Sequence, residues 1–229
     1  MEKKRIKIGV MGSASGPTIR DPRAQELARR LGEAVADRGC ICITGACPGL
    51  PDHAAAGAKA RGGFVFGVSP AFSEAEHLQV YGSPMQHYDM ILFSGMGLME
   101  RDIVNIRSSD AVVIVGGGIG TLNEFTVAYE EMKPVGVLTG TGGIADHIGD
   151  ILAKAGRHAP PERVMYEPDP ARLVERLLDV LTSHKPPMRE SDIGGEKEAP
   201  RNEKVASVLQ EQREAHDRAK RKRADKEYD

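Results

Sequence analysis

The chain has 229 residues, of which 40% are hydrophobic and 28% charged, and its formal net charge is −2 at pH 7. It is long enough for one sizeable α/β core, or for one core with an appendage. Its near-neutral charge supplies no overall electrostatic field that would attract a polyanion. Binding to nucleic acid or to an anionic membrane surface is therefore not expected.

No segment has the composition of a membrane span or a secretory signal. The apolar run near the start stops at Gly12, which is too short for a signal peptide. No later stretch stays apolar for the ~18 residues that a spanning helix needs. We therefore expect a cytoplasmic protein with no membrane partner.

Apolar, β-rich runs alternate with helical patterns as far as residue 183, and this alternation is typical of a parallel sheet covered by helices. Most of the runs are continuously apolar, as expected for strands buried on both faces. The sequence thus predicts an α/β fold, a Rossmann-like, doubly wound and mainly parallel sheet of about seven strands flanked by helices. The expected strands are 6–11, 40–44, 64–68, 90–93, 111–115, 135–138 and 164–166.

Helices are expected between these strands. Leu27, Leu31 and Val35 recur at helical spacing after Asp21 and Pro22, a pair that resembles an N-cap followed by proline at the first helical position. The other expected helices are 52–60, 100–108, 122–131, 144–155 and 171–181, with Gly39, Gly62 and Gly156 as C-terminal stops.

The composition changes at Pro186, so we expect a nucleotide-binding domain over 1–185 and a charged tail over 186–229. The segment 203–224 can form a solvated helix through Glu/Lys/Arg pairs, but it has too few apolar residues for a core. The run RAKRKR at 218–223 could contact nucleic acid or acidic lipid. Flanking acidic residues favour a solvated surface instead.

Three cysteines lie close together, at Cys40, Cys42 and Cys47. An odd number in a chain without a signal peptide does not indicate a disulfide framework. Together with His53 they could hold a metal. Burial of free cysteines in a core strand is the favoured interpretation, and no metal is expected.

The strongest local motif is SSDAVVIVGGGIGTLNEF, an apolar strand that ends in consecutive glycines and leads into a helix. Glycines let the backbone turn tightly and approach a ligand, while the free N–H groups and dipole of the first helical turn attract an anion. Thr121 can add a hydroxyl donor. The motif lacks the lysine of a P-loop and does not match Gly-x-Gly-x-x-Gly cleanly, so it predicts only a phosphate or carboxylate site.

Glu124 follows Thr121 by three residues in the same helix. One interpretation is structural, because a carboxylate near a helix N-terminus is stabilised by the dipole. The other is catalytic: a carboxylate beside a bound sugar phosphate can stabilise an oxocarbenium-like transition state or align water during N-glycosidic cleavage.

Two further loops of small residues follow expected strands, at 12–16 and 44–49. All three loops would emerge at the carboxyl edge of the sheet, where open α/β sheets bind ligands. Gly12, Ser13 and Gly45 are therefore candidate nucleotide-binding residues, although ordinary turn chemistry can explain any one loop.

The run GLMER at 97–101, the step to Asp110, and GGGIGTLNE resemble the Lonely Guy family of phosphoribohydrolases, often mislabelled lysine decarboxylases. That family lies in the wider lysine decarboxylase-like Rossmann superfamily (SLOG), which includes the DNA-processing protein A group. The resemblance covers roughly residues 5–181 in strand order, and its specific part is 95–125.

The resemblance implies hydrolysis of a nucleoside 5′-monophosphate to free base and ribose 5-phosphate, with no metal or cofactor. By position, Arg101 and Glu124 match the family's catalytic arginine and glutamate. The resemblance further implies a homodimer with the glutamate helix near the subunit boundary. The residues expected to hold the 5′-phosphate are Gly117, Gly118, Gly120 and Thr121, and those that could lie at the boundary or in the core are Phe125, Val127, Tyr129 and Met132.

Several positions depart from the family pattern. Gly116 replaces the usual proline, Asp102 replaces a lysine, and the second loop carries Ala46, Cys47 and Pro48 where the family has glycines. A side chain and a proline there can narrow the crevice. Two main hypotheses therefore stay open: a phosphoribohydrolase that uses Arg101 and Glu124, and a non-catalytic protein that binds a nucleotide or phosphorylated cofactor. A third, a DNA-handling protein, would need a basic groove, and only the run RAKRKR points to one.

Overall fold

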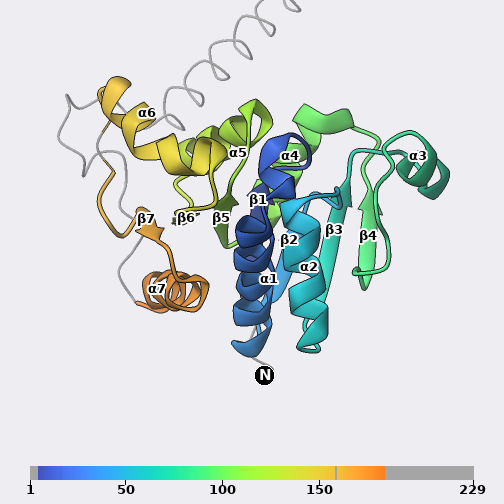
Figure 1. The fold of residues 1–229 in the computed structure, drawn as a ribbon, viewed down its shortest axis with the longest axis horizontal. Coiled ribbons are helices and arrows are strands. Elements are labelled where there is room, and N and C mark those ends of the chain that lie inside the picture. Colours follow the sequence, from blue (N-terminus) through green and yellow to red (C-terminus); the bar gives the residue numbers. More distant parts are fainter. Residues whose placement is uncertain (1–4, 158, 184–229) are drawn as a thin grey trace, which may run out of the picture. The chain divides into compact units, whose positions relative to one another are not determined.

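The computed structural model describes residues 5–157 and 159–183 (Figure 1). Seven strands form one sheet in the order β4-β3-β2-β1-β5-β6-β7, and every neighbouring pair is parallel. This confirms the predicted fold class. The strands are β1 (Lys7–Gly12), β2 (Ile41–Thr44), β3 (Phe64–Ser69), β4 (Met90–Phe93), β5 (Ala111–Val115), β6 (Val135–Leu138) and β7 (Val164–Glu167).

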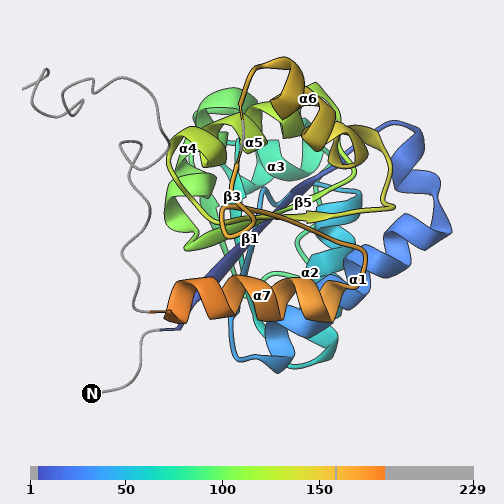
Figure 2. The ribbon, with the colours of Figure 1, turned by 90° about the vertical axis from the view of Figure 1, so that its left-hand side faces the viewer.

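Helices cover both faces of the sheet (Figure 2). On one face lie α1 (Pro22–Asp37), α2 (Leu50–Ala60) and α7 (Pro170–Thr182), and on the other lie α4 (Gly97–Ser108), α5 (Ile119–Glu130) and α6 (Ile148–Lys154). The two buried apolar clusters fill the space between each helical layer and the sheet. Three shorter elements complete the described fold: α3 (Glu74–Gln79) and the 3-10 turns η1 (Pro17–Arg20) and η2 (Gly143–His147).

Local sequence signals explain how the elements begin and end. The carboxylate of Asp21 accepts a hydrogen bond from the Arg23 N–H at 2.9 Å, which confirms the predicted N-cap of α1. Gly39, Gly62 and Gly156 adopt positive φ after α1, α2 and α6, as the predicted stops require.

Three local expectations differ from the structure. The single helix expected over 144–155 is divided into η2 and α6, because the N–H groups of Ile144 and Ala145 donate to carbonyls of the glycine turn after β5. The strand β4 is partly exposed because it lies at the sheet edge, so continuous burial was wrong there. Neither η1 nor α3 was predicted.

Among the described residues, no helix is both long enough and apolar enough to cross a membrane. The expected tail at 186–229, including 203–224 and RAKRKR, lies outside the described residues. The domain boundary at 185 therefore stays a prediction.

Candidate functional site

The strand order places the glycine turn at the topological switch point of the sheet. From β1 the chain continues to β2 on one side, and from β5 it continues to β6 on the other. Open α/β sheets bind ligands in the crevice that this reversal leaves at the carboxyl edge. The loops after β1, β2 and β5 all meet at that edge.

The glycine turn after β5 is held in shape by its own hydrogen bonds. Gly116 and Gly117 adopt φ of 59° and 100°, a region that favours glycine. The Gly116 N–H donates to Thr141 Oγ1 at 2.9 Å, and the Gly117 N–H donates to Ser13 Oγ at 2.5 Å. These two N–H donors are thus occupied within the protein, and Ser13 shapes the turn by accepting from Gly117.

The start of α5, in contrast, is open. Gly118, Ile119 and Gly120 are exposed, with Ile119 at 78%, and no side chain caps the helix. A Cβ atom built on Gly118 or Gly120 would have open space around it, with no atom within 4 Å beyond the adjoining backbone. The N–H groups of a first helical turn have no partner inside the helix. This end of α5 therefore presents free donors and a positive dipole to the crevice.

Arg101 and Glu124, predicted as the reacting pair, lie within one buried cluster. Arg101 is 5% exposed and Glu124 is 8% exposed. The Arg101 Nη2 lies 3.8 Å from Asp102 Oδ1, while its Nε and Nη1 are buried and have no hydrogen-bond partner among the described residues. The guanidinium packs directly against the backbone of Gly45, which leaves no room for a side chain at that position.

Burial dominates the electrostatics of this cluster. It raises the pKa of Glu124 to about 8, with a further increase from Asp102 and a partial decrease from Arg101 and from a hydrogen bond to Thr121. Burial likewise raises the pKa of Asp102, although Arg101 and a 3.1 Å hydrogen bond from Asn123 oppose it. Glu124 thus keeps its proton at neutral pH.

The loop after β2 packs on this cluster through Gly45, a contact that the sequence did not predict. Ala46 is fully buried with φ of 47°, and its N–H donates to Thr44 Oγ1 at 3.0 Å. Burial raises the pKa of the Cys47 thiol to about 12, and Arg101 lowers it. The loop therefore brings an uncharged thiol within electrostatic range of Arg101.

One polar pair at this edge was not predicted from the sequence. Asp52, in the first turn of α2, lies with its Oδ1 3.0 Å from Nδ1 of His87, which belongs to the segment before β4. Their separation of 35 residues gives no local signal. Only the position of Asp52 shortly after a strand could have pointed to the carboxyl edge.

Cys40, directly before β2, and Cys42, within β2, are buried in the core, as expected for free cysteines of a core strand. Within 5–157 and 159–183, no group of three or more His, Cys, Asp or Glu side chains is placed to hold a metal.

Comparison with known proteins finds one similar sequence and several similar structures. An uncharacterized protein of Archaeoglobus fulgidus is 32% identical over 135 residues, which cover 59% of this chain and 81% of the relative. The molybdenum cofactor binding protein of Rippkaea orientalis is 26% identical with a TM-score of 0.63, covering 78% of this chain and 99% of its own. The Moco carrier protein of Chlamydomonas reinhardtii is 30% identical with a TM-score of 0.62, covering 78% and 98%.

DNA processing protein A from Helicobacter pylori shares the fold, with 17% identity and a TM-score of 0.52 over 76% of this chain and 80% of its own. The model of the SLOG cluster4 family matches residues 5–174. The chain therefore belongs to the SLOG cluster4 family, within the superfamily that the glycine motif and the GLMER run resemble.

Proposed function

We propose that this protein binds a phosphorylated nucleotide or cofactor at the carboxyl edge of the sheet, with the phosphate at the start of α5. The observation that carries the proposal is the open helix start at Gly118 to Gly120, at the switch point between β1 and β5. Phosphate groups bind such helix ends through free backbone N–H groups and the dipole. Two similar structures are named as a binding protein and a carrier for the molybdenum cofactor, which supports a cofactor as the ligand.

Binding is favoured over catalysis because the charged cluster is covered. Arg101 and Glu124 are more than nine-tenths buried, and the loop containing Gly45 packs on the guanidinium. The start of α5 and the neighbouring loop after β1 are exposed at this edge. A ligand can occupy these without displacing any buried side chain.

Titration followed by amide NMR tests the binding proposal. Inorganic phosphate and a panel of nucleoside 5′-monophosphates are added to the full chain, and the amide resonances of 118–121 are followed. We expect these resonances to shift with saturation, while those of α7 on the other face stay in place. Saturable shifts confined to α7, or no shift with any member of the panel, would rule the proposal out.

N-glycosidic hydrolysis is the second candidate, favoured by the meeting of Arg101 and Glu124 in one cluster. A carboxyl group with a pKa of about 8 holds a proton at neutral pH and can donate it to a leaving base. In this reaction Arg101 would contact the sugar phosphate through charge-assisted hydrogen bonds. The loop containing Gly45 would have to move to admit the ribose.

Chromatography for free base after incubation with the same panel tests this second candidate. Hydrolysis predicts that base appears, that release declines as pH rises above about 8, and that Glu124→Gln abolishes release while phosphate binding remains. If nucleotides bind and no base appears, the protein is a binder and not a hydrolase.

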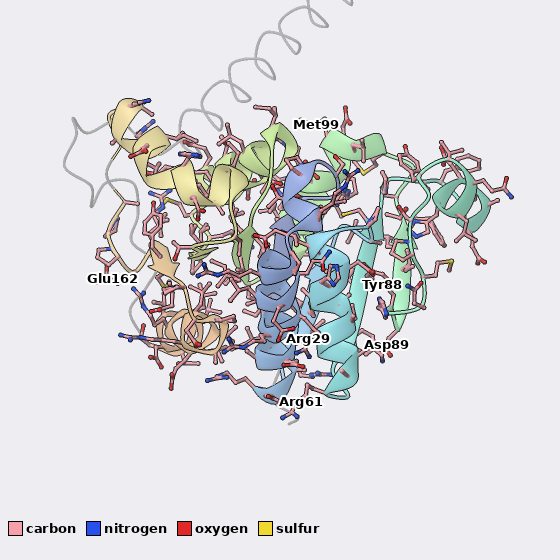
Figure 3. All side chains as sticks on the ribbon, viewed as in Figure 1. Arg29, Arg61, Tyr88, Asp89, Met99 and Glu162 are labelled. Carbon is pink, nitrogen blue, oxygen red and sulfur yellow. The ribbon has the colours of Figure 1, made fainter. Side chains whose placement is uncertain are left out.

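The family resemblance also supports a homodimer. Phe125 and Tyr129 belong to the buried core, so they do not form its boundary. The exposed apolar side chains Met96, Met99 and Ile103 lie on α4 or just before it, and Met99 stands at the outer edge of the molecule (Figure 3). We propose that this side of α4 makes the contact, and light scattering of Ile103→Glu against the parent chain tests it: a dimer should become a monomer.

A further inference from the structure

The pair Asp52–His87 lies at the carboxyl edge but outside the parts of the site used so far. The Asp52 side chain is 20% exposed, and one of its oxygens, Oδ1, is 3.0 Å from His87 Nδ1. Its second oxygen has no hydrogen-bond donor among the described residues. An acid in a first helical turn is favoured by the dipole, but that explains neither the histidine partner nor the unused oxygen.

Asp52 borders the same loop as the buried cluster. The Cys47 thiol is in electrostatic contact with both Arg101 and Asp52. Tyr88 closes the other side: its ring lies against Gly67 of β3, and its hydroxyl is 3.0 Å from Thr44 Oγ1. Asp52 therefore borders a corner of the edge in which Cys47 lies within electrostatic range of both Asp52 and Arg101.

The strand order sets the separation between this corner and the phosphate site. The helix α5 follows β5, α2 follows β2, and β1 lies between the two strands. Neighbouring strands are ~4.8 Å apart, so the two helix starts are offset by about 10 Å along the sheet, with α2 and α5 on opposite faces of it. A ligand with its phosphate at Gly118 would have to cross the carboxyl ends of β5, β1 and β2 to bring a heterocycle to Asp52.

We propose that Asp52 determines ligand specificity by accepting hydrogen bonds from a heterocycle that presents two adjacent N–H donors, as the ring N–H and exocyclic amino group of guanine do. A carboxylate has only acceptors, so it matches two donors and is mismatched with the ring-nitrogen acceptor of adenine. His87 is a positioning residue that fixes the carboxylate. This inference rests on the proposed phosphate site.

Calorimetric titration with GMP, IMP and AMP tests the proposal, because IMP lacks the amino group and AMP lacks the ring N–H. We expect the parent chain to bind GMP about 10-fold to 100-fold more tightly than AMP, with IMP between them. Asp52→Asn should lower the affinity for GMP to about the affinity for AMP. His87→Gln should reduce the preference by a smaller factor.

Asp150→Asn is the matched control, since Asp150 is also in a first helical turn but is exposed and distant in sequence. It should leave the preference for GMP unchanged. Melting curves of all variants exclude unfolding as the cause of any loss.

Failure of the specificity can be told apart from failure of the phosphate site. If all three nucleotides bind equally and Asp52→Asn changes nothing, the phosphate site stands and the role of Asp52 is overturned. A second comparison sets deoxy-GMP binding to the parent chain against GMP binding to Asp52→Asn. If the two are equally weak, the carboxylate contacts the ribose, and the proposed recognition of the base by Asp52 is overturned. If no nucleotide binds at all, the proposed function itself fails.

Discussion

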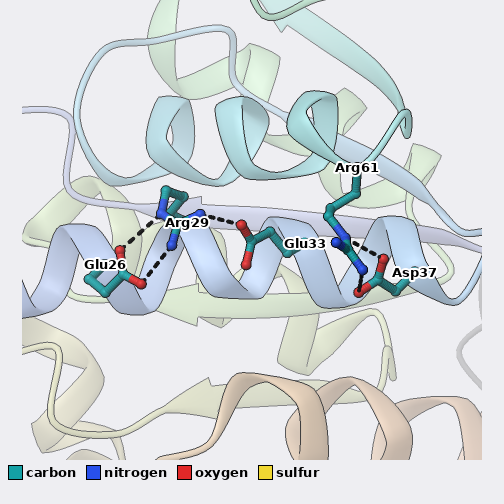
Figure 4. A network of polar contacts seen from close by, with 5 residues as sticks. All are labelled: Glu26, Arg29, Glu33, Asp37 and Arg61. Atoms are coloured by element: carbon teal, nitrogen blue, oxygen red, sulfur yellow. Dashed lines mark hydrogen bonds and ion pairs between the residues drawn. The ribbon is translucent and has the colours of Figure 1, made fainter.

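Two groups of charged side chains differ in their partners and in their exposure. One lies on the outer surface of α1 and α2, and the other lies beneath the loop after β2. On the surface, Arg29 bonds to Glu26 at 2.7 Å and to Glu33, and Arg61 bonds to Asp37 at 2.7 Å (Figure 4). Every charge in this network has a partner, and all of them also face water.

Beneath the loop, two nitrogens of Arg101, Nε and Nη1, have no hydrogen-bond partner in the described part of the chain, and its charge acts on the carboxyl groups of Asp102 and Glu124. Exposed ion pairs contribute little to stability, whereas a buried group without partners carries its full desolvation cost. The partners within the surface network account for its charges without any ligand. The buried cluster lowers the stability of the folded chain when no ligand is bound, so we infer that it serves a function.

The largest expected effect comes from the pH dependence of Glu124. Its folded-state pKa is about 8 against an ordinary value of 4.5, so the folded chain binds more protons than the unfolded chain between these pH values. Its contribution to stability is therefore fully present below pH 4.5 and is lost as pH rises through 8.

Glu124→Gln should remove this decrease of stability with rising pH. At pH 9 the variant should have a free energy of unfolding up to about 5 kcal/mol higher than the parent chain. Urea denaturation at pH 5 and pH 9 measures the free energy of unfolding of both chains. A parent chain that gains stability between these pH values while Glu124→Gln does not would show that Glu124 is ionised when folded.

Replacing Arg101 should have the next largest effect. Arg101→Met keeps much of the side-chain volume and removes a buried charge with unpartnered N–H groups. Because the change also leaves the buried Asp102 without its counter-charge, we expect the free energy of unfolding to fall by about 3–5 kcal/mol. Unchanged stability in denaturant would mean that Arg101 does not compensate this carboxylate in the folded chain.

A smaller effect is expected for the hydroxyl that shapes the glycine turn. Ser13→Ala leaves the buried N–H of Gly117 without its acceptor, which should cost about 1–3 kcal/mol. Ser15→Ala, at an exposed position of the same loop, is the control and should be neutral. Equal melting temperatures for both variants would indicate that water replaces the Ser13 hydroxyl.

The smallest effect is expected on the surface. Arg29→Gln breaks two exposed ion pairs, and the change in thermal stability should be slight and should shrink further in high salt. A large loss of thermal stability that does not depend on salt would contradict the distinction between the exposed network and the buried cluster.

The fold was predictable because its signals are local. Continuous apolar runs gave β5 and β6 at the bounds observed, and the Asp21–Pro22 pair gave the start of α1. The short α3 lacks apolar periodicity. It is anchored by His77, whose Nδ1 is 2.8 Å from Ser69 Oγ and whose Nε2 is 3.2 Å from the Pro84 carbonyl, and no such contact can be read from spacing.

The residues of the candidate site could be predicted from the sequence, but their packing, protonation and hydrogen bonds could not. The glycine motif and the family resemblance named Arg101 and Glu124, which the fold brings into one cluster. The packing of Gly45 on Arg101, the proton held by Glu124 and the use of the Gly117 N–H by Ser13 all depend on which strands are neighbours. Strand order is a long-range property, so these features required the structure.

The central claim, a phosphate at the start of α5, is tested most directly at Gly118, where a side chain meets open space. Gly118→Asp places a carboxylate where the phosphate should bind, and Gly118→Asn is its neutral counterpart of equal shape. In calorimetric titrations with GMP, we expect Gly118→Asp to weaken binding at least about tenfold relative to Gly118→Asn. Equal affinity of the two variants would contradict the claim.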